Sequence, residues 1–124
     1  NTASYCGYTP QFEGLEQLHQ TYQSAGLAVV GFSSDDFWQE DNDEEDAADV
    51  CFEKYSVSFP GMATSAIKGN DANPIFRGLG EAADYPRWNF NKYLIGRDGK
   101  VYKGYRSKVK PDSEMLISAI ERLL

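Results

Sequence analysis

A helical segment that leads directly into a short apolar run is the feature that most limits the folds open to this chain. Residues 10–25 carry apolar side chains about one turn apart, and Gly26 suits the left-handed conformation that ends many helices. The apolar run 27–32 follows without a linker and is bounded by polar residues. Such a run indicates a buried strand of a helix-flanked sheet. The sequence therefore predicts an α/β protein.

Two further helices are expected in the middle of the chain. One is predicted over residues 43–55, with acidic residues in its first turn and Cys51 in its interior. The other begins at an Asn-Pro pair, residues 73–74, which suits the cap and the first helical position. We expect this helix to end near Gly78 or Gly80, since glycine often follows the last helical turn.

The last third of the chain predicts a hairpin and a helix. An Asp-Gly pair at 98–99 lies between two runs suited to strands, 92–95 and 100–103. This pair is typical of a two-residue hairpin turn in which both central residues have positive φ. Residues 111–124 place apolar side chains on one face, as in an amphipathic helix. The order helix, strand, helix, hairpin, helix is that of a thioredoxin-like fold with a central mixed sheet.

The composition fits one domain over residues 1–124. Hydrophobic residues make up 41% of the chain, enough for a substantial core. The net charge of −7 argues against a nucleic acid as partner. No apolar run reaches the roughly 18 residues of a membrane span, so the chain is not expected to cross a membrane. Two cysteines are too few for a disulfide scaffold or a four-thiolate zinc site, but they suffice for one redox pair.

Cys6 is predicted to carry a reactive thiol. It precedes the helix at 10–25, and Gly7 and Pro10 beside it indicate a tight turn. The N-terminus of a helix has partial positive charge and unpaired N–H groups, and both favour a thiolate over a thiol. The alternatives are a buried, inert cysteine and one half of a structural disulfide.

Other groups give weaker indications of chemistry. His19, the single histidine, lies in mid-helix and is expected to be a polar or partly packed residue, not a general base. The acidic stretch 35–49 lacks the glycine and the last carboxylate of a calcium loop, so we expect a solvated loop and helix start. Trp88 and Asn89 together offer an indole N–H and an amide donor, which can stabilise a thiolate or a leaving oxygen. For Trp88, a core aromatic is the alternative.

Several motifs, in order along the chain, resemble those of the glutathione peroxidase family. The matching segments cover essentially the whole chain and are residues 1–11 (NTASYCGYTPQ), 31–40 (GFSSDDFWQE), 57–60 (VSFP), 88–94 (WNFNKYL) and 97–101 (RDGKV).

The resemblance implies a thioredoxin-fold peroxidase that needs no cofactor. Cys6 matches the peroxidatic position, where a thiolate attacks the O–O bond, releases water or an alcohol, and becomes a sulfenic acid. Trp88 and Asn89 match two residues that donate hydrogen bonds at this site. Cys51 matches the resolving cysteine of the thioredoxin-dependent branch and would form a disulfide with Cys6. Because a disulfide needs Cα atoms within about 7 Å, we expect the helix around Cys51 to unwind locally.

Three departures from the family pattern affect these expectations. Asp36 takes the position of a family glutamine, where an ionised carboxylate would disfavour the thiolate and a protonated one could relay a proton. Relatives carry about thirty more residues before the cysteine motif, so the domain is expected to be N-terminally incomplete here, without its first strands. The short link before Trp88 resembles monomeric relatives with an open site.

The resemblance also suggests substrates, partners and a location. Hydrogen peroxide and organic or lipid hydroperoxides are the expected substrates, and thioredoxin or a similar dithiol protein is the expected reductant, with glutathione as a further candidate. The variant SSDDF at 33–37 resembles exported bacterial members, which suggests the periplasm, with the cytoplasm as the alternative. Two rival functions stay open: a redox sensor that passes a disulfide to a partner, and a structural module with a permanent Cys6–Cys51 bridge.

Overall fold

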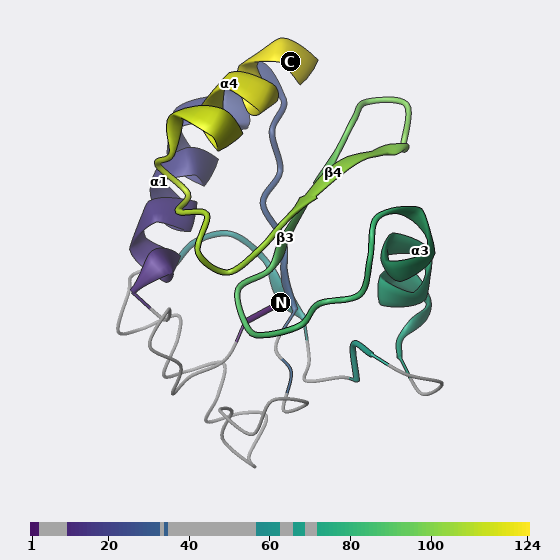
Figure 1. Cartoon of the computed structure of the whole chain (residues 1–124). Coiled ribbons are helices and arrows are strands. Elements are labelled where there is room, and N and C mark those ends of the chain that lie inside the picture. Colours follow the sequence, from purple (N-terminus) through teal and green to yellow (C-terminus); the bar gives the residue numbers. More distant parts are fainter. Residues whose placement is uncertain (3–9, 33, 35–56, 63–65, 69–71) are drawn as a thin grey trace.

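Helices lie on both sides of a central hairpin in the computed structural model, which describes residues 1–2, 10–32, 34, 57–62, 66–68 and 72–124 (Figure 1). The described elements are α1 (Gln11–Tyr22), η1 (Gln23–Ala25), β1 (Gly31–Phe32), β2 (Gly61–Met62), α3 (Pro74–Ala82), β3 (Lys92–Ile95), β4 (Val101–Tyr105) and α4 (Glu114–Leu123). The two long helices α1 and α4 lie together on one side of the hairpin, and α3 lies on the other (Figure 1). This is the layered α/β arrangement that the sequence predicts.

The first helix follows its prediction closely. Helix α1 continues into the short 3₁₀ turn η1, and Gly26 ends the helical segment with a φ of 114°. This positive φ is the conformation that glycine adopts without strain. Pro10 occupies the N-cap position, so the helix begins at Gln11, one residue later than the predicted segment.

Among the described residues, the strands are short and form two separate two-stranded sheets. β1 pairs with β2 in parallel, and β3 pairs with β4 in antiparallel. The strand predicted at 27–32 is therefore correct only for its last two residues. Residues 27–30 are not part of a strand in the described part of the chain. They line an apolar cavity of about 250 Å³ that residues of β3 also line.

Helix α3 runs longer than its glycines predict. Asn73 caps it by accepting a hydrogen bond from the Phe76 N–H at 3.0 Å, as expected. The helix then continues past Gly78 and Gly80 to Ala82, so the predicted end was wrong. A Cβ at Gly80 would approach the Tyr85 ring to 2.5 Å. Gly80 therefore permits close packing and does not end the helix.

The hairpin has the predicted strands but a different turn. The Gly99 N–H donates to the Gly96 carbonyl at 3.0 Å, and the Gly96 N–H donates to the Lys100 carbonyl at 2.9 Å. Gly99 has a φ of 81°, whereas Asp98 is not among the described residues with positive φ. The expectation of two positive φ values was therefore wrong. A longer loop ending in a left-handed glycine replaces the two-residue turn.

The final helix begins later than predicted. Ser113 caps α4 through its hydroxyl, which accepts from the Leu116 N–H at 3.4 Å. Residues 111 and 112, predicted to be helical, therefore lie outside the helix, and Ser113 is its cap. None of the helices in the described part of the chain is long and apolar enough to span a bilayer.

The two faces of the hairpin carry separate cores. Leu94 and Tyr105 pack with Leu18 of α1 and Leu116 of α4 on one face. On the other face, Tyr93 packs against a cluster of Ile67, Phe76 and Leu79. Alternation along β3 sends neighbouring side chains to opposite layers, as the two-residue period of a strand requires. The hairpin is thereby fixed from both sides.

A buried carboxylate attaches the segment before β2 to helix α1. Glu16 is 6% exposed and accepts hydrogen bonds from the Ser58 N–H at 2.8 Å, the Ser58 hydroxyl at 2.6 Å and the Phe59 N–H at 3.3 Å. The Gln20 amide also donates to it, at 2.6 Å. Burial raises the pKa of Glu16, but these hydrogen bonds outweigh it, so the pKa lies below its usual value of 4.5.

We expect Glu16→Ala to lower the free energy of unfolding by about 3 kcal/mol at pH 7, because the backbone N–H groups of Ser58 and of buried Phe59 lose a charged acceptor. A lowered pKa in the folded state means that the ionised carboxylate stabilises the fold above pH 4.5. That contribution disappears as the pH falls through the lowered pKa. The difference between wild type and variant should therefore be constant from pH 7 to about pH 5 and shrink in more acidic solution, as measured by urea unfolding.

Glu13→Ala is the matched control, because Glu13 is exposed on the same helix. It should change the free energy of unfolding by less than about 0.5 kcal/mol. Equal destabilisation by the two substitutions would contradict the role of the Glu16 hydrogen bonds.

Candidate active site

Three separate stretches of chain meet where β1 ends and β3 begins. The Thr2 N–H donates to the Phe32 carbonyl at 2.7 Å, and the Ser34 N–H donates to the Thr2 carbonyl at 3.1 Å. On the opposite side, the Phe90 N–H donates to the Asn1 carbonyl at 2.6 Å. Residues 1–2 thus lie between the end of β1 and the turn before β3. Ends of strands that converge in this way are common places for functional sites in α/β proteins.

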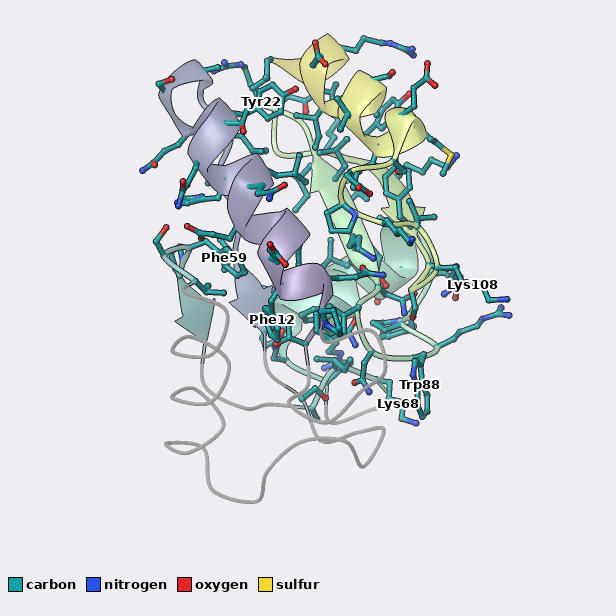
Figure 2. All side chains as sticks on the ribbon, turned by 90° about the vertical axis from the view of Figure 1, so that its left-hand side faces the viewer. Phe12, Tyr22, Phe59, Lys68, Trp88 and Lys108 are labelled. Atoms are coloured by element: carbon teal, nitrogen blue, oxygen red, sulfur yellow. The ribbon has the colours of Figure 1, made fainter. Side chains whose placement is uncertain are left out.

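The turn that holds Trp88 and Asn89 is part of this meeting point. Asn89 is completely buried, whereas Trp88 is 36% exposed and is therefore not a core aromatic. Phe90 has a φ of 61°, a left-handed conformation that costs a residue with a side chain about 1 kcal/mol. The Phe90 ring packs edge-to-face on Phe12 of α1, with centroids 5.0 Å apart. Figure 2 shows Phe12 and Trp88 toward the same end of the molecule, with Tyr22 at the opposite end.

Two buried side chains hold the carbonyl groups of this turn. The Asn91 amide donates to the Trp88 carbonyl at 2.7 Å, and the Ser107 hydroxyl donates to the Asn89 carbonyl at 2.5 Å. The same Asn91 amide also donates to the Ser107 hydroxyl, at 3.3 Å. Asn91 and Ser107 are 4% and 6% exposed. The turn therefore keeps its left-handed conformation through contacts that water cannot easily replace.

An arginine that follows β4 forms a hydrogen bond with Asn91 and so fixes its side chain. Arg106 donates to the Asn91 side-chain oxygen at 3.3 Å, to the Tyr85 carbonyl at 3.1 Å and to the Asp84 carboxylate at 2.6 Å. The hydrogen bond from Arg106 lowers the pKa of Asp84, with help from the Tyr85 N–H. The Tyr93 hydroxyl donates to the Asp84 carbonyl at 2.5 Å, and burial raises the pKa of Tyr93 to about 12. The segment before Trp88 is thus tied to the hairpin.

A half-buried lysine adds positive charge beside the turn. The Lys92 ammonium group donates to the Phe90 carbonyl at 2.7 Å and to the Ser107 carbonyl at 3.4 Å. Burial lowers the pKa of Lys92 to about 8. The group therefore stays mostly protonated at neutral pH. Positive charge near the turn favours any anion that forms there, a thiolate included.

Trp88 and Asn89 are the predicted site residues that lie within the described part of the chain. Cys6, Asp36 and Cys51, together with the predicted helix at 43–55, lie outside it. The described neighbours of two of them are bonded to each other: Thr2 precedes Cys6 by four residues, and Ser34 precedes Asp36 by two.

Two other sequence interpretations concern a histidine and a metal. His19 is buried and packs edge-to-face on Phe59, with ring centroids 6.2 Å apart, which matches the packed helix position expected for it. Among the described residues there is no group of three or more His, Cys, Asp or Glu side chains that could hold a metal ion. The acidic stretch 35–49, where the sequence was compared with a calcium loop, lies wholly outside the described residues.

The sequence interpretation missed Asn91, Ser107 and Gln11. The Gln11 amide donates to the Ser107 carbonyl at 2.8 Å and so joins the first residue of α1 to this network. Gln11 and Asn91 lie in two of the matching segments, but no pattern there assigns them a role, and Ser107 lies outside all of these segments. Their contacts with one another bridge 16 to 96 positions of sequence. One signal was available: the predicted hairpin, extended beyond its strands, brings residue 91 near residues 106 and 107. The register Lys92↔Tyr105 agrees with that extension.

The fold and the site define an α/β protein of the thioredoxin-like class. A crystal structure of Trgpx in its apo form is similar to 98% of this chain and 77% of that chain, with a TM-score of 0.72 and 32% sequence identity. The profile of the glutathione peroxidase family matches residues 1–80. The chain belongs to the glutathione peroxidase family.

Curated relatives span the whole chain. It is 38% identical to the glutathione peroxidase-like peroxiredoxin GPX5 of Chlamydomonas reinhardtii over 100% of this chain and 79% of the relative. It is 40% identical to the glutathione peroxidase homolog BsaA of Staphylococcus epidermidis, over 100% of this chain and 81% of the relative. The hydroperoxy fatty acid reductase gpx1 of Synechocystis is 36% identical, over 100% and 79%. The protein is thus a thiol peroxidase, which reduces a hydroperoxide at the expense of a thiol reductant.

Proposed function

We propose that Cys6 is the peroxidatic residue and Cys51 the resolving residue of this enzyme. The Cys6 thiolate attacks one oxygen of the O–O bond, and the other oxygen takes up a proton and leaves as water or an alcohol. The resulting sulfenic acid is attacked by the Cys51 thiol, which forms the disulfide and releases the sulfenic oxygen as one water. A dithiol reductant then returns both cysteines to thiols and is itself oxidised to a disulfide.

The observation that supports this proposal is the anchored turn at Trp88 and Asn89. Ser107 connects this turn to Gln11, the first residue of α1, and Cys6 lies five residues before Gln11 in sequence. An indole N–H and a buried amide near the start of α1 suit the two needs of peroxide cleavage. They can stabilise the attacking sulfur and the oxygen that leaves.

Asp36 is proposed as a further residue of this site. Its carboxyl group stands where the family has a glutamine, and Ser34, two residues before it, is bonded to Thr2 at the meeting of the strands. In the protonated form, Asp36 would pass a proton to the leaving oxygen. In the ionised form, it would raise the pKa of the Cys6 thiol by like-charge repulsion.

We propose that the substrates are organic or lipid hydroperoxides as well as hydrogen peroxide. We propose thioredoxin or a similar dithiol protein as the reductant. The names of the relatives from Chlamydomonas and Synechocystis, a peroxiredoxin and a hydroperoxy fatty acid reductase, support this choice. We further propose a monomer, because the link between α3 and Trp88 is short. We propose an exported, periplasmic location from the SSDDF variant, with the cytoplasm as the alternative.

The test is steady-state peroxide reduction by the wild-type protein with thioredoxin and, separately, with glutathione. We expect many turnovers with thioredoxin and far fewer with glutathione. After one equivalent of peroxide without reductant, a peptide map should contain a Cys6–Cys51 disulfide that mild dithiol removes.

Two results would contradict the proposal. A single equivalent of peroxide consumed in the presence of reductant would indicate a redox sensor that requires its own partner. A Cys6–Cys51 bridge that resists mild dithiol, without any reaction with peroxide, would indicate a structural module.

A further inference from the structure

Ser107 bonds both the Asn89 turn and the first residue of α1. Its hydroxyl donates to the Asn89 carbonyl at 2.5 Å and accepts from the Asn91 amide at 3.3 Å. Its carbonyl accepts from the Gln11 amide at 2.8 Å and from the Lys92 ammonium at 3.4 Å. Four polar groups therefore converge on one small residue that is 6% exposed.

This convergence links the turn before β3 to the start of α1 through one residue. Gln11 begins α1, whose N-terminal charge favours the Cys6 thiolate in the proposed mechanism. Asn89 precedes Phe90, which has a φ of 61°. This left-handed conformation needs support from the surrounding structure. A loss of the Ser107 hydroxyl would leave the Asn89 carbonyl without this bond and weaken the link between turn and helix.

We propose that Ser107 is a positioning residue of the peroxidase, which sets where the Asn89 donor lies relative to the start of α1. The inference rests on the proposed function, because it assumes that Asn89 stabilises the reacting groups around Cys6. Ser107 itself touches neither sulfur nor peroxide in this role. It acts by holding a donor in place before the reaction, so that no reorganisation is needed as the O–O bond breaks.

The test compares two reactions of Cys6 in a Cys51→Ser background, where Cys6 is the single thiol. Ser107→Ala should lower the second-order rate constant for hydrogen peroxide about tenfold, because a donor displaced by a fraction of an ångström stabilises the leaving oxygen less well. Alkylation of Cys6 by iodoacetamide has no leaving oxygen. Its rate constant in Ser107→Ala should therefore differ from that of the parent by less than twofold at every pH from 5 to 9. Ser107→Thr keeps the hydroxyl and should retain at least half of the peroxide rate constant.

Ser118→Ala, an exposed serine on α4, is the matched control and should behave as the parent in both reactions. If Ser107→Ala fails to fold, Gln11→Met loosens the same link from the helix side and should give the same selective loss.

Two results would overturn the inference. One is a peroxide rate constant within twofold of the parent in Ser107→Ala, and the other is an equal loss in both reactions, which would indicate a general structural role. A failure of the proposed function is recognised separately, because Asn89→Ala would then also leave peroxide reduction unchanged.

Discussion

Cys6→Ser is expected to reduce peroxide consumption to the uncatalysed rate. A serine hydroxyl is not ionised to a useful extent near neutral pH and cannot form the sulfenic acid on which the cycle depends. The charge of the α1 N-terminus lowers a thiol pKa enough to matter, but it cannot bring an alcohol into this range. The measurement is steady-state consumption of hydrogen peroxide with thioredoxin and its reductase.

Cys51→Ser is the matched control, because it removes the other cysteine and leaves the attacking sulfur in place. It should still consume one equivalent of peroxide rapidly and then stop with thioredoxin as reductant, with a sulfenic acid on Cys6 that mass spectrometry detects. If Cys6→Ser kept a measurable turnover, or if both variants failed to consume the first equivalent, the assignment of the two cysteines would be wrong.

Local signals predicted most of the described fold. Gly26 and the Asn73 cap mark element ends through interactions within a few residues, so they can be recognised without knowledge of the tertiary structure. Gly80 misled the prediction because its role is a contact with Tyr85, which follows the helix. The hairpin turn also differed from its prediction. An Asp-Gly pair suits both the two-residue turn and the longer loop that ends in a left-handed glycine, so the pair alone does not determine the loop length.

The candidate site was predictable only in part. Trp88 and Asn89 stand out because they belong to a recognisable motif in one stretch of sequence. Ser107 lies outside the matching segments, and Gln11 ends one of them without a recognisable role. A single serine or glutamine carries no periodic or turn signal, and the partners of both residues are brought close only by the fold. Residues that hold a catalytic group from behind are therefore found from the hydrogen bonds of the folded chain.

Asn89→Ala is expected to lower the rate constant for peroxide by about 10² to 10³, the loss typical of removing one fixed donor from a developing oxyanion. The side chain is fully buried and its backbone is anchored by Ser107, so the amide does not have to be ordered during the reaction. Water has little access to that position and cannot readily replace the lost donor. The measurement is stopped-flow oxidation of Cys6 by hydrogen peroxide in the Cys51→Ser background, with the thiol pKa taken from the pH dependence of alkylation.

Asn73→Ala is a control of the same chemical change at a distant place, the cap of α3. It should cost about 1 kcal/mol of stability and leave the peroxide rate constant unchanged. A comparable loss of rate in both variants would show that reduced stability, and not a missing donor, explains the effect of Asn89→Ala. If only Asn89→Ala is slow while its thiol pKa is unaltered, the amide acts on the leaving oxygen. If instead the thiol pKa rises, and the free energy of that rise equals the free energy of the rate loss, the amide acts on the thiolate. In wild type its hydrogen bond would then stabilise the attacking sulfur before the O–O bond begins to break.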